Sequence, residues 1–182
     1  MNRRYLPVTV TGILFVLLIL AGSWQFEGFA SLRVFLNLLT DNAFLAVTAL
    51  GMTLVILSGG IDLSVGSVLA FSSVLCAVLV ENFSWHPLQA IPLVLLLGAV
   101  FGALMGTIIH VYRLQPFIVT LAGMFFARGL ATIISEQSIP IEHPFFEAVN
   151  DFGFALPGRA WFSSAAMLLI LVFGFGLWLM HF

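Results

Sequence analysis

The sequence predicts an all-α polytopic membrane protein with about six transmembrane helices. Of its 182 residues, 62% are hydrophobic and only 8% are charged, and the mean hydropathy is +1.17. Soluble domains are about 45–50% apolar and about 25% charged. Several uncharged runs approach the roughly 20 residues that cross a bilayer as a helix, and hydrocarbon offers the backbone no hydrogen-bond partner. These runs are therefore expected to cross the membrane as helices.

The first predicted span is the uncharged run at residues 6–24, which follows Arg3 and Arg4 and ends at Trp24. Arginines ahead of an apolar run also begin signal peptides, so a cleaved signal is the alternative interpretation. No small-residue cleavage site follows the run, and we therefore expect a retained helix with a cytoplasmic N-terminus. The charged stretch at residues 27–40 is expected to be a partly interfacial connector.

Five more spans follow this connector in the predicted topology. Between them lie a loop at residues 81–87, a short basic turn at Arg113, and an acidic, proline-rich segment at residues 135–159 that is too polar to cross. An inside N-terminus places Arg113 inside and the acidic segment outside, which agrees with the tendency of basic residues to stay cytoplasmic. The predicted spans are residues 43–58, 63–80, 88–110, 116–134 and 160–182.

The chain stops in an apolar run, residues 176–182, with no polar tail behind the last predicted helix. We therefore expect residues 1–182 to be a single transmembrane domain that is truncated at its C-terminus.

A polar, glycine-rich break at residues 58–67 separates the second and third predicted spans. Asp62 is the one charged residue between Asn42 and Val80, and a carboxylate next to hydrocarbon is costly enough to suggest function. Glycines let the chain leave helical geometry at positive φ, and Asp62 and Ser64 carry oxygens for the free amides of the next helix. Helix capping is the expected role of these side chains, and a place on a transport pathway is the alternative. The motif residues are Gly59, Gly60, Asp62, Ser64 and Gly66.

Small residues mark one face of each of the next two long helices. Gly98, Gly102 and Gly106 recur every four residues, and Gly123 belongs to a similar face of the fifth predicted span. Such faces let two membrane helices approach closely, so we expect them to pack against other helices, with a ligand groove as the alternative. Arg128 lies near the outer end of its span, where snorkelling or a structural ion pair is expected and a pathway role is the alternative.

Catalytic and metal-binding chemistry find no candidate residues in the sequence. The chain has no lysine, so it lacks the phosphate-binding lysine that P-loop ATPases require. Its four histidines are scattered and have no cysteine partners at zinc-ligand spacing. We expect the chain to bind no cofactor, metal or nucleic acid, and any ATP and Mg²⁺ to be held by a separate subunit.

Two ordered stretches resemble the permease subunits of ribose-type carbohydrate ABC importers. One begins as NLLTDN at residues 37–42 and continues as ALGMTLVILSGGIDLSVGS at residues 49–67, and the other is QPFIVTLAGMFFARGL at residues 115–130. Within that family the chain is similar to galactofuranose importer permeases, on the sequences GFAS at residues 28–31, TDNAFL at residues 40–45, and SEQSIPIEHP at residues 135–144.

This resemblance implies the N-terminal part of a ten-span permease with a type II-like importer fold, in a bacterial inner membrane. It implies three protein partners: a cytoplasmic ATPase subunit, a second permease subunit and a periplasmic sugar-binding protein. Sugar would then pass from periplasm to cytoplasm by alternating access. Two other interpretations stay open on the residues alone, an ion-coupled secondary transporter or channel that uses Asp62, and a membrane fragment that transports nothing.

Overall fold

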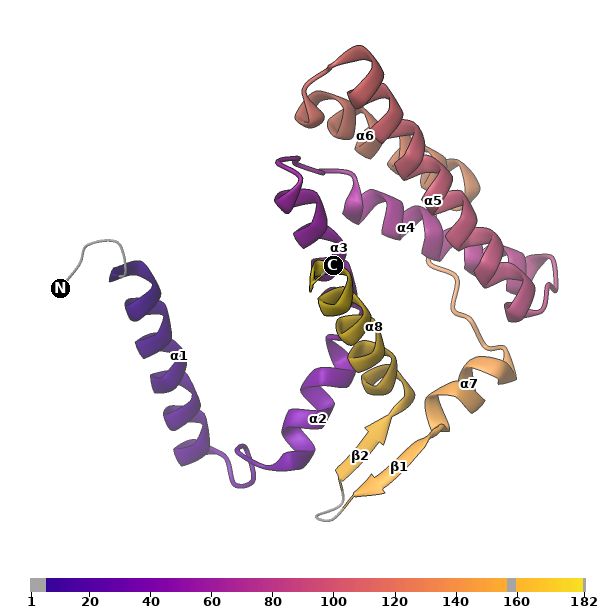
Figure 1. The fold of residues 1–182 in the computed structure, drawn as a ribbon. Helices are drawn as coiled ribbons and strands as arrows, with labels where there is room; N and C mark the ends of the chain where they lie inside the picture. Colours follow the sequence, from indigo (N-terminus) through magenta and orange to yellow (C-terminus); the bar gives the residue numbers. More distant parts are fainter. Residues whose placement is uncertain (1–5, 157–159, 182) are drawn as a thin grey trace.

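The computed structural model describes residues 6–156 and 160–181, and most of this chain is helical (Figure 1). Each of the six predicted apolar segments contains a helix, which confirms the helical membrane class. Arg3, Arg4 and Arg159 lie outside the described residues. These six helices are α1 (Leu6–Gln25), α3 (Ala43–Leu57), α4 (Val65–Ala77), α5 (Pro87–Tyr112), α6 (Pro116–Ile134) and α8 (Ser164–His181).

Four stretches of helix in the described chain are individually long and apolar enough to cross a membrane. A fifth candidate is the bent pair of α2 (Leu32–Asp41) and α3, and α8 is a shorter apolar helix over Ser164–Trp178. The four stretches are Val8–Gln25, Val65–Asn82, Pro87–Tyr112 and Pro116–Ile134.

The expected connector contains α2, which meets α3 at an angle of 60°. Alone, α3 has 15 residues, fewer than the roughly 20 that span the hydrocarbon. Asn42 makes the joint: its backbone N–H and its side-chain amide both donate to Leu38, while its own carbonyl accepts from Ala46. The polar residue thus closes one helix and opens the next.

The segment after α6 departs from the prediction. It holds α7 (Pro144–Asp151) and an antiparallel hairpin of β1 (Gly153–Leu156) and β2 (Ala160–Ser163), in which Phe154 lies opposite Phe162. The sixth span was expected to begin near residue 160, and this start is wrong. The side chain of Ser163 accepts the N–H of Ala166 at 3.2 Å, so this N-cap starts α8 four residues later.

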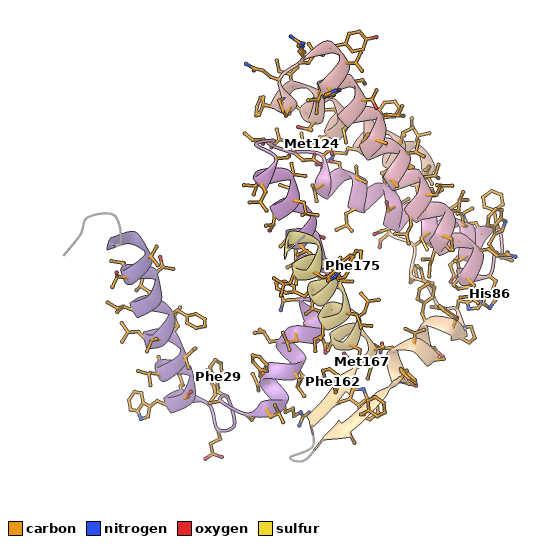
Figure 2. All side chains as sticks on the ribbon, in the orientation of Figure 1. Phe29, His86, Met124, Phe162, Met167 and Phe175 are labelled. Carbon is orange, nitrogen blue, oxygen red and sulfur yellow. The ribbon has the colours of Figure 1, made fainter. Side chains whose placement is uncertain are left out.

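Polar contacts tie the α4–α5 turn to the segment before α7. Helix α4 ends in a π-helical turn, Val78–Asn82. In this turn, the Glu81 carboxylate accepts the N–H of Glu142 at 2.8 Å. His86 and His143 each accept an amide of the helix that follows, and their rings lie 5.3 Å apart (Figure 2). Two loops that are far apart in sequence are therefore held at one end of the helices.

Alanines make up much of the core. α4 lies against α6 and α5, α3 lies against α8, and α1 stands apart from the rest (Figure 1). Ala90, Ala127 and Ala166 are at most 1% exposed. At Gly123 of α6, a Cβ would collide with Met105 of α5. Close approach of backbones through small residues is the usual means of helix association in membranes.

Replacing Gly123 with leucine is expected to lower the free energy of unfolding by about 1–3 kcal/mol, because Met105 is buried and has little room to move. Thermal unfolding of the purified chain in detergent measures the change. Gly129→Leu on the same helix is the control, since nothing lies within 4 Å of a Cβ there. Equal melting temperatures for the two variants would contradict a tight α5–α6 contact.

Candidate functional site

The glycine-rich break is a corner between α3 and α4, and its first half is a Schellman motif. The N–H of Gly60 donates to Val55 and the N–H of Gly59 donates to Ile56, both at 3.0 Å, which pairs two carbonyls at the end of α3. Gly59 adopts φ +78°, where a side chain is strained. A Cβ on Gly60 would lie 3.3 Å from Cγ1 of Val55. The two glycines are thus needed for different reasons.

Asp62 organises the second half of the corner. One oxygen of its carboxylate accepts both the backbone N–H of Ser64, at 2.7 Å, and the Ser64 hydroxyl, at 2.6 Å. Ser64 is 1% exposed, and its carbonyl accepts the first helical bond of α4, from Val68. The Ser64 hydroxyl donates to Asp62, and its oxygen accepts no capping bond from an amide of α4.

Thr120 of α6 fastens the corner from the side. Its hydroxyl oxygen lies 3.2 Å from the carbonyl of Ile61 and 2.8 Å from that of Pro116, so the proton is shared between the corner and its own helix. Thr120 is 4% exposed. The sequence analysis missed this residue, because nothing in the pattern links a threonine in α6 to a carbonyl 59 positions earlier.

Two cavities, of about 420 Å³ and about 400 Å³, flank the corner, and we call them the corner cavities. Asp62, Gly102 and Met105 line both. Ser64 and Gly98 line the first, and the corner glycines, Gly106 and Thr120 line the second. The break and the glycine stripe of α5, which the sequence left unconnected, therefore face the same space.

The α5 stripe makes no close helix contact within the described chain. No atom lies within 4 Å of a Cβ built on Gly98, Gly102 or Gly106, whereas Gly123 packs directly against α5. The expected packing of the stripe against another helix stays a prediction for contacts beyond this chain. Its open side leaves room for a second backbone or for a solute.

Arg128 and Gly66 share a different cavity, of about 500 Å³, between α4 and α6. The arginine is exposed in the described chain, and Ser67, Ala131 and Ser135 line the cavity beside it. Arg128 and Asp62 line no common cavity. Whether Arg128 snorkels to the membrane surface stays a prediction.

The corner supplies hydrogen bonding and shape but no reactive centre. One carboxylate, five hydroxyl side chains and mostly apolar walls line the corner cavities, with no second titratable group among them. Among the residues that the structure describes, no three histidine, cysteine, aspartate or glutamate side chains converge as metal ligands. A polar, glycine-rich corner between two apolar helices, with cavities beside it, is a feature that membrane transport proteins share.

The comparisons with known proteins give the family. Residues 34–181 match the family model described as the branched-chain amino acid transport system / permease component. The chain therefore belongs to this family of permease components. No solved structure matches the chain.

Three relatives from Escherichia coli (strain K12) carry more specific names. The chain is 49% identical over 181 residues to the inner membrane ABC transporter permease protein YjfF, covering 100% of this chain and 55% of the relative. It is 39% identical to the ribose import permease protein RbsC, covering 72% of this chain and 40% of the relative. It is 34% identical to the galactofuranose transporter permease protein YtfT, covering 74% of this chain and 36% of the relative. The resemblance to sugar ABC permeases is confirmed, and the chain spans about half the length of these relatives or less.

Replacing Thr120 with valine is expected to destabilise the chain by about 0.5–1.5 kcal/mol, because it removes the hydrogen bond that the buried Thr120 hydroxyl donates to the carbonyl of Ile61. Thr132→Val is the matched control, since the exposed Thr132 hydroxyl bonds only within its own helix, to Arg128. Thermal unfolding in detergent distinguishes the two. If both variants melt at the same temperature as the parent, the α6 contact does not hold the corner.

Proposed function

We propose that this chain is part of the permease subunit of an ATP-driven sugar importer in a bacterial inner membrane. The observation that carries the proposal is the likeness over the whole chain to an ABC permease, together with relatives named for ribose and galactofuranose. The family description names branched-chain amino acids, whereas the relatives at 39% and 34% identity are named for ribose and galactofuranose. A pentose or hexose is therefore the proposed cargo, with galactofuranose as one candidate.

The corner is proposed to keep α3 and α4 at a fixed angle beside the sugar path. The bonds of Gly59, Gly60 and Asp62 lie within the corner itself and Thr120 adds one from α6, so α3 and α4 would move as one body with α6 when the transporter changes state. The corner cavities lie along the glycine stripe of α5, and their walls are mostly apolar. Alternating access would then expose the path first to the periplasm and next to the cytoplasm, with no chemical change in the sugar.

Energy for transport is proposed to come from a partner subunit. Without any lysine, this chain has no P-loop, so ATP and Mg²⁺ are assigned to a cytoplasmic ATPase subunit. The remaining proposed partners are a second permease subunit and a periplasmic sugar-binding protein. The proposed orientation places the N-terminus in the cytoplasm and α7 with its hairpin in the periplasm.

Sugar uptake by reconstituted vesicles tests the proposal. The chain is co-expressed with the ATPase subunit, second permease and binding protein of its transport system, and the complex that co-purifies is placed in proteoliposomes. Uptake of radiolabelled D-ribose, D-fructose and D-galactose is then measured. ATP or a non-hydrolysable analogue is supplied on the side of the membrane that carries the ATPase subunit. We expect uptake of at least one sugar only with ATP, unchanged by ionophores.

Two results would contradict the proposal. Uptake that follows an ion gradient and ignores ATP would identify an ion-coupled transporter. If the chain does not co-purify with the ATPase subunit, it is a membrane fragment that does not belong to such a complex.

A further inference from the structure

A polar cavity of about 470 Å³ lies between α2, the end of α7 and the hairpin, and we call it the hairpin cavity. It shares no lining residue with the corner cavities. Its volume falls within the roughly 300–1,000 Å³ of small-molecule sites. We propose that it binds a neutral monosaccharide, an inference that rests on the proposed function in sugar transport. Six residues line it: Asn37, Thr40, Asn150, Asp151, Trp161 and Ser163.

The lining has the chemistry that a sugar requires. Each sugar hydroxyl both donates and accepts a hydrogen bond, and the cavity offers two carboxamides, a carboxylate and two hydroxyls. Trp161 adds an aromatic face that can lie against the apolar C–H face of a sugar ring. The corner cavities, by contrast, have mostly apolar walls. The hairpin cavity is thus the better match to a polyhydroxylated ligand.

The hairpin holds Trp161 in place. A Cβ built on Gly153 would lie 2.7 Å from Nε1 and 2.8 Å from Cε2 of the indole, so the ring lies against the bare backbone of β1. Trp161 nevertheless remains 42% exposed. One part of the indole is packed and another part is left open to a ligand.

Two hydroxyls join the cavity walls. Thr40 of α2 and Ser163 of β2 are linked by a hydrogen bond of 2.7 Å, and Ser163 also caps α8. These groups therefore position the two walls. Within the described residues, the side chains of Asn37, Asn150 and Asp151 make no hydrogen bond, and all three line the cavity.

In the predicted topology, the cavity opens on the periplasmic side, because the connector and the acidic segment both lie there. A sugar would meet this cavity before it reached the corner cavities. On that topology, the hairpin cavity would be the first cargo-binding site at the outer end of the proposed path.

Saturation-transfer NMR on the purified chain in detergent tests the proposal directly, with D-ribose, D-fructose and D-galactose as probes and L-leucine as the non-sugar control. We expect saturable binding of at least one sugar and none of L-leucine. Asp151→Ala and Trp161→Leu are expected to raise the Kd at least about tenfold, because each removes a main contact.

The matched controls are Glu147→Ala, another exposed carboxylate of α7, and Trp85→Leu, whose indole is 40% exposed but lines no part of the cavity. Both are expected to bind like the parent chain. Circular dichroism and gel filtration establish that each variant is folded. Asp151→Ala keeps the test valid if Trp161→Leu disturbs the hairpin.

Equal affinity in all four variants would overturn the hairpin cavity as the site, and so would the absence of sugar binding or preferential binding of L-leucine. ATP-dependent sugar uptake by the reconstituted transporter, with either result, would leave the proposed function standing. The two proposals are therefore separable.

Discussion

A break in a membrane span must satisfy its own backbone, because hydrocarbon supplies no hydrogen-bond partner and each unpaired polar group costs several kcal/mol. In this chain the requirement is met within a few residues. The end of α3 is paired by Gly59 and Gly60, the start of α4 is paired through Asp62, and the exposed carbonyl between them is reached by Thr120. The position of α4 against α6, and with it the shape of both corner cavities, depends on this set of bonds.

The two kinds of glycine in the fold have different consequences. Gly123 brings α5 and α6 together, and their contact forms one wall beside the corner. Gly98, Gly102 and Gly106 make no such contact and leave the neighbouring space open. One small-residue face is therefore closely packed, and the other is open toward the cavities that Asp62 lines. The packed pair of α5 and α6 is thus rigid, and a second helix or a solute can occupy the open space beside α5.

Much of the helical fold could be predicted from the sequence, because long uncharged runs leave the backbone no other option in a membrane. The corner was predicted for the same reason, since Asp62 and its glycines interrupt such a run. The sequence did not predict the 60° bend at Asn42, the hairpin or the Thr120 contact. Residues 160–163 are apolar enough to read as helix, and their strand pairing depends on a partner segment ahead of a turn. The hairpin cavity is assembled from three elements, so no local pattern could indicate it.

Hydrogen–deuterium exchange of the corner amides, residues 58–68, tests the central claim most directly. Asp62→Ala removes the acceptor of the Ser64 N–H, whereas Asp62→Asn retains a side-chain oxygen in the same place and removes only the charge. The account predicts faster exchange in Asp62→Ala and near-parental exchange in Asp62→Asn. Parental exchange in Asp62→Ala would contradict it, because the corner would then be held by something other than these bonds.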